Sequence, residues 1–102
     1  MEFLNKVELK GIVGSVHALT FGLHSVTRFS LATEYCYKED DGTPVIETTW
    51  FNCAAQGLET KLEKGDKAHV IGRLRARNWT DSHNEPHYTF EVIAQSVSKI
   101  ED

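Results

Sequence analysis

Three arginines at alternate positions, followed by a tryptophan, are the residues of this chain best suited to binding chemistry. They lie in the stretch Gly72–Asp81, which reads GRLRARNWTD. Successive side chains of a strand point to opposite faces, so Arg73, Arg75 and Arg77 share one face, and Trp79 follows at its end. A row of fixed positive charge beside an indole suits a flexible polyanion that carries flat bases. The alternative is a solvated strand face with a tryptophan at its rim.

The distribution of charge supports a local basic stripe although the whole chain is acidic. The formal net charge is −4, and acidic residues gather at positions 39–41 and 101–102. Fields beyond about 8–10 Å are screened at physiological salt, so a local cluster can still bind a polyanion. More than half of the eleven basic residues fall in one segment: Lys61, Lys64, Lys67, Arg73, Arg75 and Arg77.

Length and composition predict one globular domain spanning residues 1–102. The chain has 102 residues, of which 40% are hydrophobic and 25% charged. It contains no apolar run of the roughly 18 residues that a membrane helix needs, and its N-terminus lacks the pattern of a signal peptide. We therefore expect a cytoplasmic protein that does not bind or cross a membrane. Cys36 and Cys53 are expected to be small buried hydrophobic residues in a reducing compartment.

Period-two alternation predicts an all-β protein. Strands are expected over residues 4–18, 25–37, 45–56, 66–77 and 87–97, with polar turns between most of them. One short helix is expected over Gly57–Lys64, where Leu58 and Leu62 are four residues apart. Gly11 and Gly14 interrupt the first strand and predict a bulge or bend. Several strands with glycine-rich bends favour a small closed barrel over an open sheet.

The aromatic residues divide into core and surface candidates. Phe29 and Phe90 lie mid-strand on apolar faces and are expected in the core. Trp50 shares its face with polar residues, and Tyr37 and Trp79 lie at strand ends beside polar turns. These three could be rim or core residues, or they could contact a partner.

Catalysis and metal binding find little support in the sequence. It contains neither a glycine-rich phosphate loop before a helix nor a Gly-x-Ser-x-Gly motif. His83 and His87 are four apart, but they flank a turn that contains Pro86, and no Cys-x-x-Cys pair accompanies them. We therefore expect no enzyme, no metal and no cofactor.

Five segments in register resemble the bacterial single-stranded DNA-binding protein family, and the resemblance extends from Asn5 to about Lys99. It implies a five-stranded OB-fold, a Greek-key barrel with one short helix between strands three and four. It also implies sequence-independent binding of single-stranded DNA during replication, recombination and repair, by a homo-oligomer in which a tetramer is favoured and a dimer is possible. The matching segments are Asn5–Gly11, Phe29–Thr33, Thr49–Gly57, Gly72–Asp81 and Thr89–Val92.

The resemblance also assigns roles to individual residues. The family's stacking tryptophans correspond to Trp50 and Trp79, and a third stacking position carries Tyr37. A fourth, commonly aromatic, carries Gln56, which implies one fewer or a displaced platform. The phosphates of the DNA backbone are expected to contact Arg73, Arg75 and Arg77. Any of these three arginines could instead pair with Glu91 on the neighbouring strand. The remaining expected phosphate contacts are Lys61, Lys64 and Lys67, and the expected subunit contacts are Phe51, Val7 and Leu9.

The end of the sequence departs from the family and leaves alternatives open. Family members usually continue into a long tail that recruits replication and repair proteins, whereas this sequence stops at Asp102. Recruitment of such proteins is therefore doubtful, and a tail-less length also suits the related dimeric primosomal proteins of replication restart. The alternative from another class is an OB-fold assembly module that binds protein and buries its aromatic residues between subunits.

Overall fold

Five long strands make up the chain in a computed structural model that describes residues 1–57 and 61–101. Their bounds lie within three residues of those predicted from the alternation of side chains. The strands are β1 (Val7–Phe21), β2 (His24–Lys38), β3 (Pro44–Gln56), β4 (Lys67–Thr80) and β5 (Pro86–Lys99).

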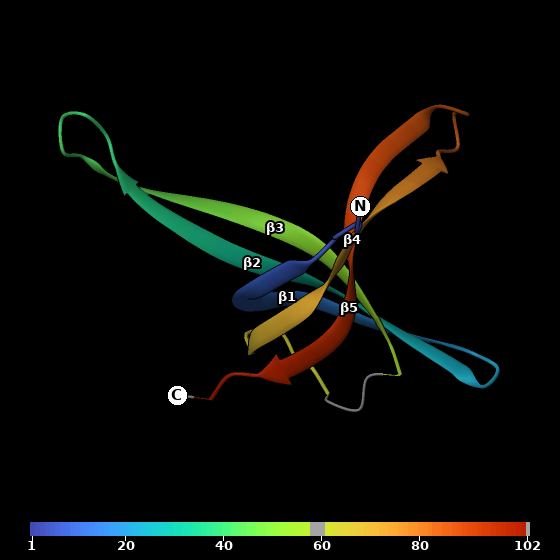
Figure 1. The fold of residues 1–102 in the computed structure, drawn as a ribbon. Coiled ribbons are helices and arrows are strands. Elements are labelled where there is room, and N and C mark those ends of the chain that lie inside the picture. The colour runs from blue at the N-terminus through green and yellow to red at the C-terminus, as the bar shows by residue number, and fades with distance from the viewer. Residues whose placement is uncertain (58–60, 102) are drawn as a thin grey trace.

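The strands close into a barrel in the order β1-β2-β3-β5-β4, with β4 returning to pair with β1 (Figure 1). All neighbours are antiparallel except β3 and β5, which pair in parallel over three residues beginning at Cys53 and Val92. This is the Greek-key barrel that the sequence predicted.

Glycines allow β1 to bend around the barrel. The register of β1 against β2 shifts between Val13 and Val16, a stretch that contains Gly14, and this confirms the predicted irregularity. At Gly11, a Cβ atom would collide with the carbonyl oxygen of Ala32 on β2, so the two strands can approach this closely only with glycine there.

The core lies inside the barrel and is made of small and medium side chains. Phe29 is buried, as predicted, but Phe90 is 64% exposed, so its predicted core position is wrong. Cys53 is buried, and burial raises the pKa of its thiol to about 12. Cys36 is exposed, which contradicts its predicted burial. The main buried residues are Val13, Phe29, Leu31, Cys53, Ala55, Leu62, Ala68, Val70 and Val92.

The predicted short helix over Gly57–Lys64 is absent from the part of this segment that the structure describes. Gly57 is a bend, residues 61–63 are irregular, and Lys64 and Gly65 form a turn; residues 58–60 lie outside the described residues. Leu62 is nevertheless buried in the core. The apolar spacing thus indicated a buried contact and not a helical face.

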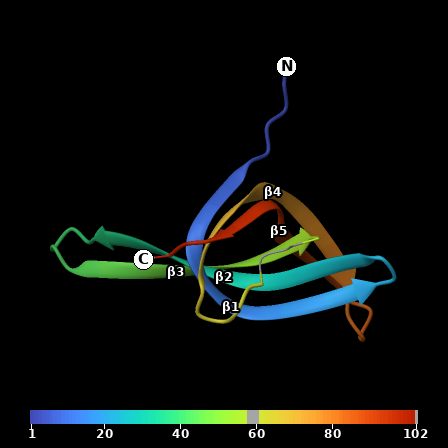
Figure 2. The same cartoon turned by 90° about the horizontal axis from the view of Figure 1, so that it is seen from below.

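The β1–β2, β2–β3 and β4–β5 hairpins extend beyond the barrel (Figures 1 and 2), and the last two carry the aromatic candidates Tyr37 and Trp79. We call the part of β2 and β3 from Glu34 to Thr48 the acidic hairpin, and the part of β4 and β5 from Leu74 to Phe90 the basic hairpin. Because of these extensions the radius of gyration is 16.1 Å, against about 13 Å for a compact domain of this length. No helix among the described residues is long and apolar enough to cross a membrane.

Candidate nucleic-acid interface

One continuous outer face crosses four strands of the barrel. Arg28 on β2 pairs with Ala54 on β3, Ala54 pairs with Ile93 on β5, and Ile93 pairs with Arg73 on β4. Directly paired residues point to the same side of a sheet. Residues at even spacing from these share that side, which we call the outer face: Trp50 and Asn52 on β3, Arg75, Arg77 and Trp79 on β4, and His87, Thr89 and Glu91 on β5.

Arg75 is held by a buried carboxylate. Its Nη2 donates to Glu91 Oε1 at 2.6 Å, and Nη1 of Arg28 donates to Glu91 Oε2 at 2.8 Å. Arg28 reaches Glu91 across β3, where its paired residue is the small Ala54. Glu91 is only 2% exposed. Burial raises the pKa of Glu91, but the two guanidinium groups outweigh this effect, so its pKa lies below the usual range.

The other two arginines line grooves on the outer face. Arg73 and Arg75 border a groove of about 240 Å³ together with Gln56 and Arg28. Arg77 borders a smaller groove of about 110 Å³ that crosses to Ser15, Ser30 and Asn52. The sequence left open which arginine would pair with Glu91; the structure shows that Arg75 does, and it leaves Arg73 and Arg77 exposed along the grooves.

The indole of Trp50 extends from β3 across β2 to a glycine of β1. Trp50 is paired with Ala32 on β2, and a Cβ atom built on Gly14 of β1 would lie 2.6 Å from Cζ3 of the indole. Glycine at position 14 is therefore what lets the ring lie across to β1. The side chain remains 60% exposed, which is what stacking on a ligand requires.

Trp79 stacks on His87 in the basic hairpin. The two residues are paired across β4 and β5, with ring centroids 4.2 Å apart and an interplanar angle of 11°. Nε2 of His87 is 2.8 Å from Oδ2 of Asp81, which fixes the imidazole from its edge. Trp79 keeps 46% of its surface exposed.

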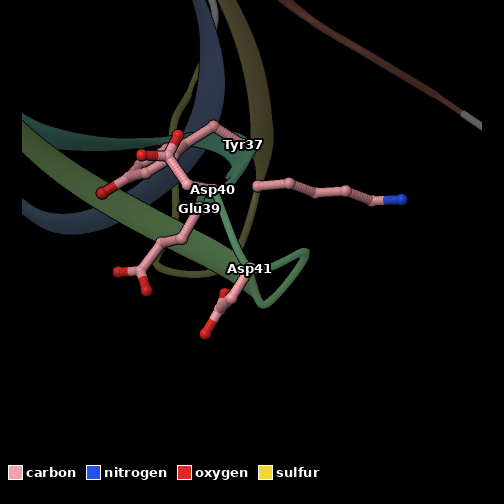
Figure 3. A pocket seen from close by; sticks show the side chains of 5 residues that line it. Tyr37, Glu39, Asp40 and Asp41 are labelled. Atoms are coloured by element: carbon pink, nitrogen blue, oxygen red, sulfur yellow. The ribbon is translucent and has the colours of Figure 1, made fainter.

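Tyr37 lies apart from the two tryptophans. Tyr37 is five residues from Ala32, the residue paired with Trp50. Because this spacing is odd, the side chains of Tyr37 and Trp50 point to opposite faces of the β2–β3 ribbon. Tyr37 borders a hollow of about 580 Å³ at the tip of the acidic hairpin together with Lys38 and three acidic residues, Glu39, Asp40 and Asp41. Figure 3 shows the three carboxylates spread around the loop beside Tyr37. The aromatic set expected from the sequence is thus divided between an arginine-rich face and an acidic tip.

The lysines do not continue the arginine row. Lys61 and Lys64 belong to the connection between β3 and β4, and Lys67 begins β4 at the end opposite Arg77. Ten residues of strand separate Lys67 from Arg77, up to about 33 Å if the strand were straight. The predicted six-residue track is therefore divided into two groups.

The residues expected at a subunit interface contact their own chain. Val7, Leu9 and Phe51 are partly buried and pack against the core. Their apolar character is accounted for within one barrel, and their role between subunits stays a prediction. Exposed apolar side chains instead occur on the inner face of the basic hairpin, where Leu74, Tyr88 and Phe90 share one side.

Arg28 and His87 are outer-face residues that the sequence reasoning missed. His87 was considered only as a metal ligand. Arg28 could have been found from its even spacing to Ser30 and Ala32 on the polar side of β2. The contact of His87 with Trp79 depends on the register of the β4–β5 hairpin, which a five-residue turn fixes and the strand pattern does not.

Comparison with known proteins agrees with this geometry. Residues 4–100 match the model of the Single-strand binding protein family. The chain is 33% identical over 109 residues to "Single-stranded DNA-binding protein 1" of Xylella fastidiosa (strain 9a5c), covering 98% of this chain and 79% of the relative. It is 30% identical over 105 residues to "Single-stranded DNA-binding protein 1" of Chlorobaculum tepidum, covering 95% of this chain and 65% of that relative.

A solved structure shares the fold over nearly the whole chain. It is described as "Plasmodium falciparum SSB complex with ssDNA", with a TM-score of 0.89 at 24% identity, covering 99% of this chain and 98% of the other. The fold is therefore an OB-fold, a five-stranded Greek-key barrel. The chain belongs to the single-strand binding protein family. Its members are non-enzymatic binding proteins, in agreement with the sequence prediction.

Proposed function

We propose that this chain binds and protects single-stranded DNA without sequence preference during replication, recombination and repair. The observation that carries the proposal is that Trp50, Trp79 and the exposed arginines share the outer face, in a chain of this family. A cytoplasmic, nucleoid-associated location follows from that role. The primosomal alternative would use the same fold in replication restart.

The arginines supply the electrostatic part of binding. Arg73 and Arg77 contact phosphates along the grooves, and each contact releases condensed counterions. Arg75 contributes less because Glu91 neutralises part of its charge. The three lysines contribute only to a strand long enough to reach the other end of β4.

The tryptophans supply the stacking part of binding, which selects single-stranded over duplex DNA. Each base stack contributes about 1–3 kcal/mol, a general value for single-strand-binding proteins of this class and not one derived from this chain. Every base has a π-face, so stacking tolerates any sequence. The bases of a duplex are already stacked on each other and cannot lie on Trp50 or Trp79.

Tryptophan fluorescence on addition of oligo-dT tests the proposal directly. The sequence has two tryptophans, and both lie on the outer face, so binding is expected to quench most of the signal. Duplex DNA of equal length should not compete. Unchanged fluorescence together with no binding would contradict the proposal and favour the assembly module, in which the aromatic residues contact protein.

We also propose that the chain forms a homo-oligomer, with a tetramer favoured. The accessible surface is 7984 Å², whereas a folded monomer of this size exposes about 5800 Å². Part of the excess is apolar and lies on the inner face of the basic hairpin, which a second copy of the chain would cover. The predicted subunit contacts Val7, Leu9 and Phe51 would then belong to the part of the barrel next to that surface.

Light scattering coupled to size-exclusion chromatography measures the oligomeric state. We expect a mass of four chains for the unmodified protein and a smaller assembly for Phe90→Asp. Thr89→Asp on the outer face is the matched control and should keep the assembly. A monomer at micromolar concentration would contradict the oligomer without affecting the DNA-binding proposal.

A further inference from the structure

We infer that His87 is a positioning residue of the interface: it backs one face of Trp79 so that a base stacks on the other, and its protonation strengthens binding of single-stranded nucleic acid. The inference rests on the proposed function and adds a pH response to it.

The geometry leaves one face of the indole for a ligand. The imidazole lies 4.2 Å from the indole at 11°, so it covers one face almost in parallel. The exposed surface of Trp79 must therefore belong to its opposite face and its edges. A base that stacked there would complete a three-layer arrangement of imidazole, indole and base.

The imidazole is itself fixed by a rigid turn. Oδ2 of Asp81 is 2.8 Å from Nε2 of His87, while Oδ1 accepts from the backbone N–H groups of His83 and Glu85. Asn84 donates its N–H to the Asp81 carbonyl and adopts a positive φ of 65°. The hydrogen bond with His87, followed by that from Glu85, lowers the pKa of Asp81 below its usual range. Asp81 is thus an anion at neutral pH and can pair with an imidazolium.

Few other groups face His87. At this level β4 and β5 pair only with each other, because the described β1 pairing ends at Gly72 and the β3 pairing spans 92–94. The nearby charges are the carboxylate of Asp81 and the guanidinium of Arg77, which lies diagonally across on the outer face. Glu85 and His83 are exposed in the turn. No further element packs against this site among residues 1–57 and 61–101.

An imidazolium at position 87 places a positive charge beside the phosphates that follow Arg77. Its cation–π contact with the indole forms in the free protein as well, so this contact holds the ring in place without itself adding to the affinity. The gain in affinity therefore comes from the added charge, and for one exposed ion pair it is at most about fivefold.

Oligo-dT affinity measured at pH 8 and pH 5.5, at constant ionic strength, tests the inference. We expect the unmodified protein to bind more tightly at pH 5.5, by up to about fivefold. His87→Ala should bind more weakly at both values and lose the rise. His87→Phe restores an aromatic backing without titration, so it should recover part of the lost affinity and show no rise. His24→Gln, which removes an exposed histidine at the β1–β2 turn, should keep the rise.

A second readout does not need DNA. In the Trp50→Phe background, Trp79 is the single tryptophan, and a protonated imidazole stacked on it should quench its fluorescence as the pH falls. Adding His87→Phe should abolish this pH dependence. Circular dichroism confirms that each variant is folded.

The outcomes separate this inference from the proposed function. A pH rise that survives in His87→Phe, or tighter binding by His87→Ala, would overturn the inference and leave the function intact. The second result would mean that His87 blocks the stacking face. Absence of oligo-dT binding at every pH would overturn the proposed function itself, and with it the inference.

Discussion

The acidic and basic hairpins have similar shapes but different distributions of charge. The acidic hairpin carries five carboxylates and one lysine, whereas the basic hairpin carries two arginines on the outer face and two carboxylates in or beside its turn. Each is a β-ribbon closed by a turn in which an aspartate accepts a backbone hydrogen bond: Asp41 from Thr43 in the acidic hairpin, and Asp81 from His83 and Glu85 in the basic one. Each also carries an aromatic candidate for base stacking. The difference is that Tyr37 lies among carboxylates, whereas Trp79 follows the arginine row.

This comparison shows that an exposed aromatic ring is not sufficient to define a stacking site. A base brings a phosphate with it, and the local charge decides whether that phosphate is attracted. By this criterion we expect the basic hairpin, with Arg75, Arg77 and Trp79, to contribute more to binding than the acidic hairpin with Tyr37.

The largest expected effect concerns the anchor of the basic hairpin. Glu91→Ala leaves Arg28 and Arg75 without their buried partner, and we expect it to lower the free energy of unfolding by about 2–3 kcal/mol. Glu47→Ala, an exposed carboxylate of the acidic hairpin, is the matched control and should change it by less than about 0.5 kcal/mol. Urea denaturation measures both. Equal stabilities would mean that Glu91 does not anchor the hairpin.

The same carboxylate predicts a pH dependence of stability. The pKa of Glu91 in the folded protein lies below its ordinary value of 4.5. The folded state therefore gains stability from the ionised form above pH 4.5, and this gain is lost as the pH falls through the lower folded pKa. Urea midpoints between pH 7 and pH 3 should fall more steeply for the unmodified protein than for Glu91→Gln. Parallel curves would contradict the prediction.

The next effect compares the two aromatic candidates. Trp79→Ala should weaken oligo-dT binding about tenfold or more, because one stack is lost. Tyr37→Ala should weaken it less than about fivefold, which corresponds to the low end of the stacking range, because carboxylates lie around Tyr37. Fluorescence anisotropy with labelled oligo-dT measures both. An equal or larger loss for Tyr37→Ala would reverse the ranking of the hairpins.

A smaller effect distinguishes the arginines from the lysines. Arg77→Gln should reduce the slope of log affinity against log salt by about 0.7, the value for one phosphate contact on a single strand. Lys61→Gln should leave the slope for a short oligo-dT unchanged, because Lys61 belongs to the distant β3–β4 connection. A reduced slope for Lys61→Gln would show that the DNA path reaches that end of the barrel.

The smallest effect concerns the acidic tip. Removing charge with Glu39→Gln and Asp40→Asn should raise oligo-dT affinity less than about twofold at low salt, and the gain should vanish at high salt. Asp41 is left unchanged because it holds the turn. A loss of affinity would mean that these carboxylates act in binding other than by repulsion.

Sequence alternation predicted the strands and the outer face because both depend on local spacing. The same-face placement of Trp50 relative to Ala54, and of Trp79 relative to Arg73, follows from even separations within single strands. Phe90 was misplaced because alternation identifies its face but not where the strand leaves the barrel. The pairing of Arg75 with Glu91, the stack of His87 on Trp79 and the distance of the lysines all depend on contacts between strands.

The absence of a side chain at Gly14 affects the entropy of binding as well as the shape of the surface. The indole of Trp50 rests over that position before any ligand arrives, so its rotamers are already restricted. Immobilising a flexible side chain on binding costs about 0.5–1.5 kcal/mol. At Trp50 part of that cost is met during folding, so more of the stacking energy remains as affinity when a base lies on the ring.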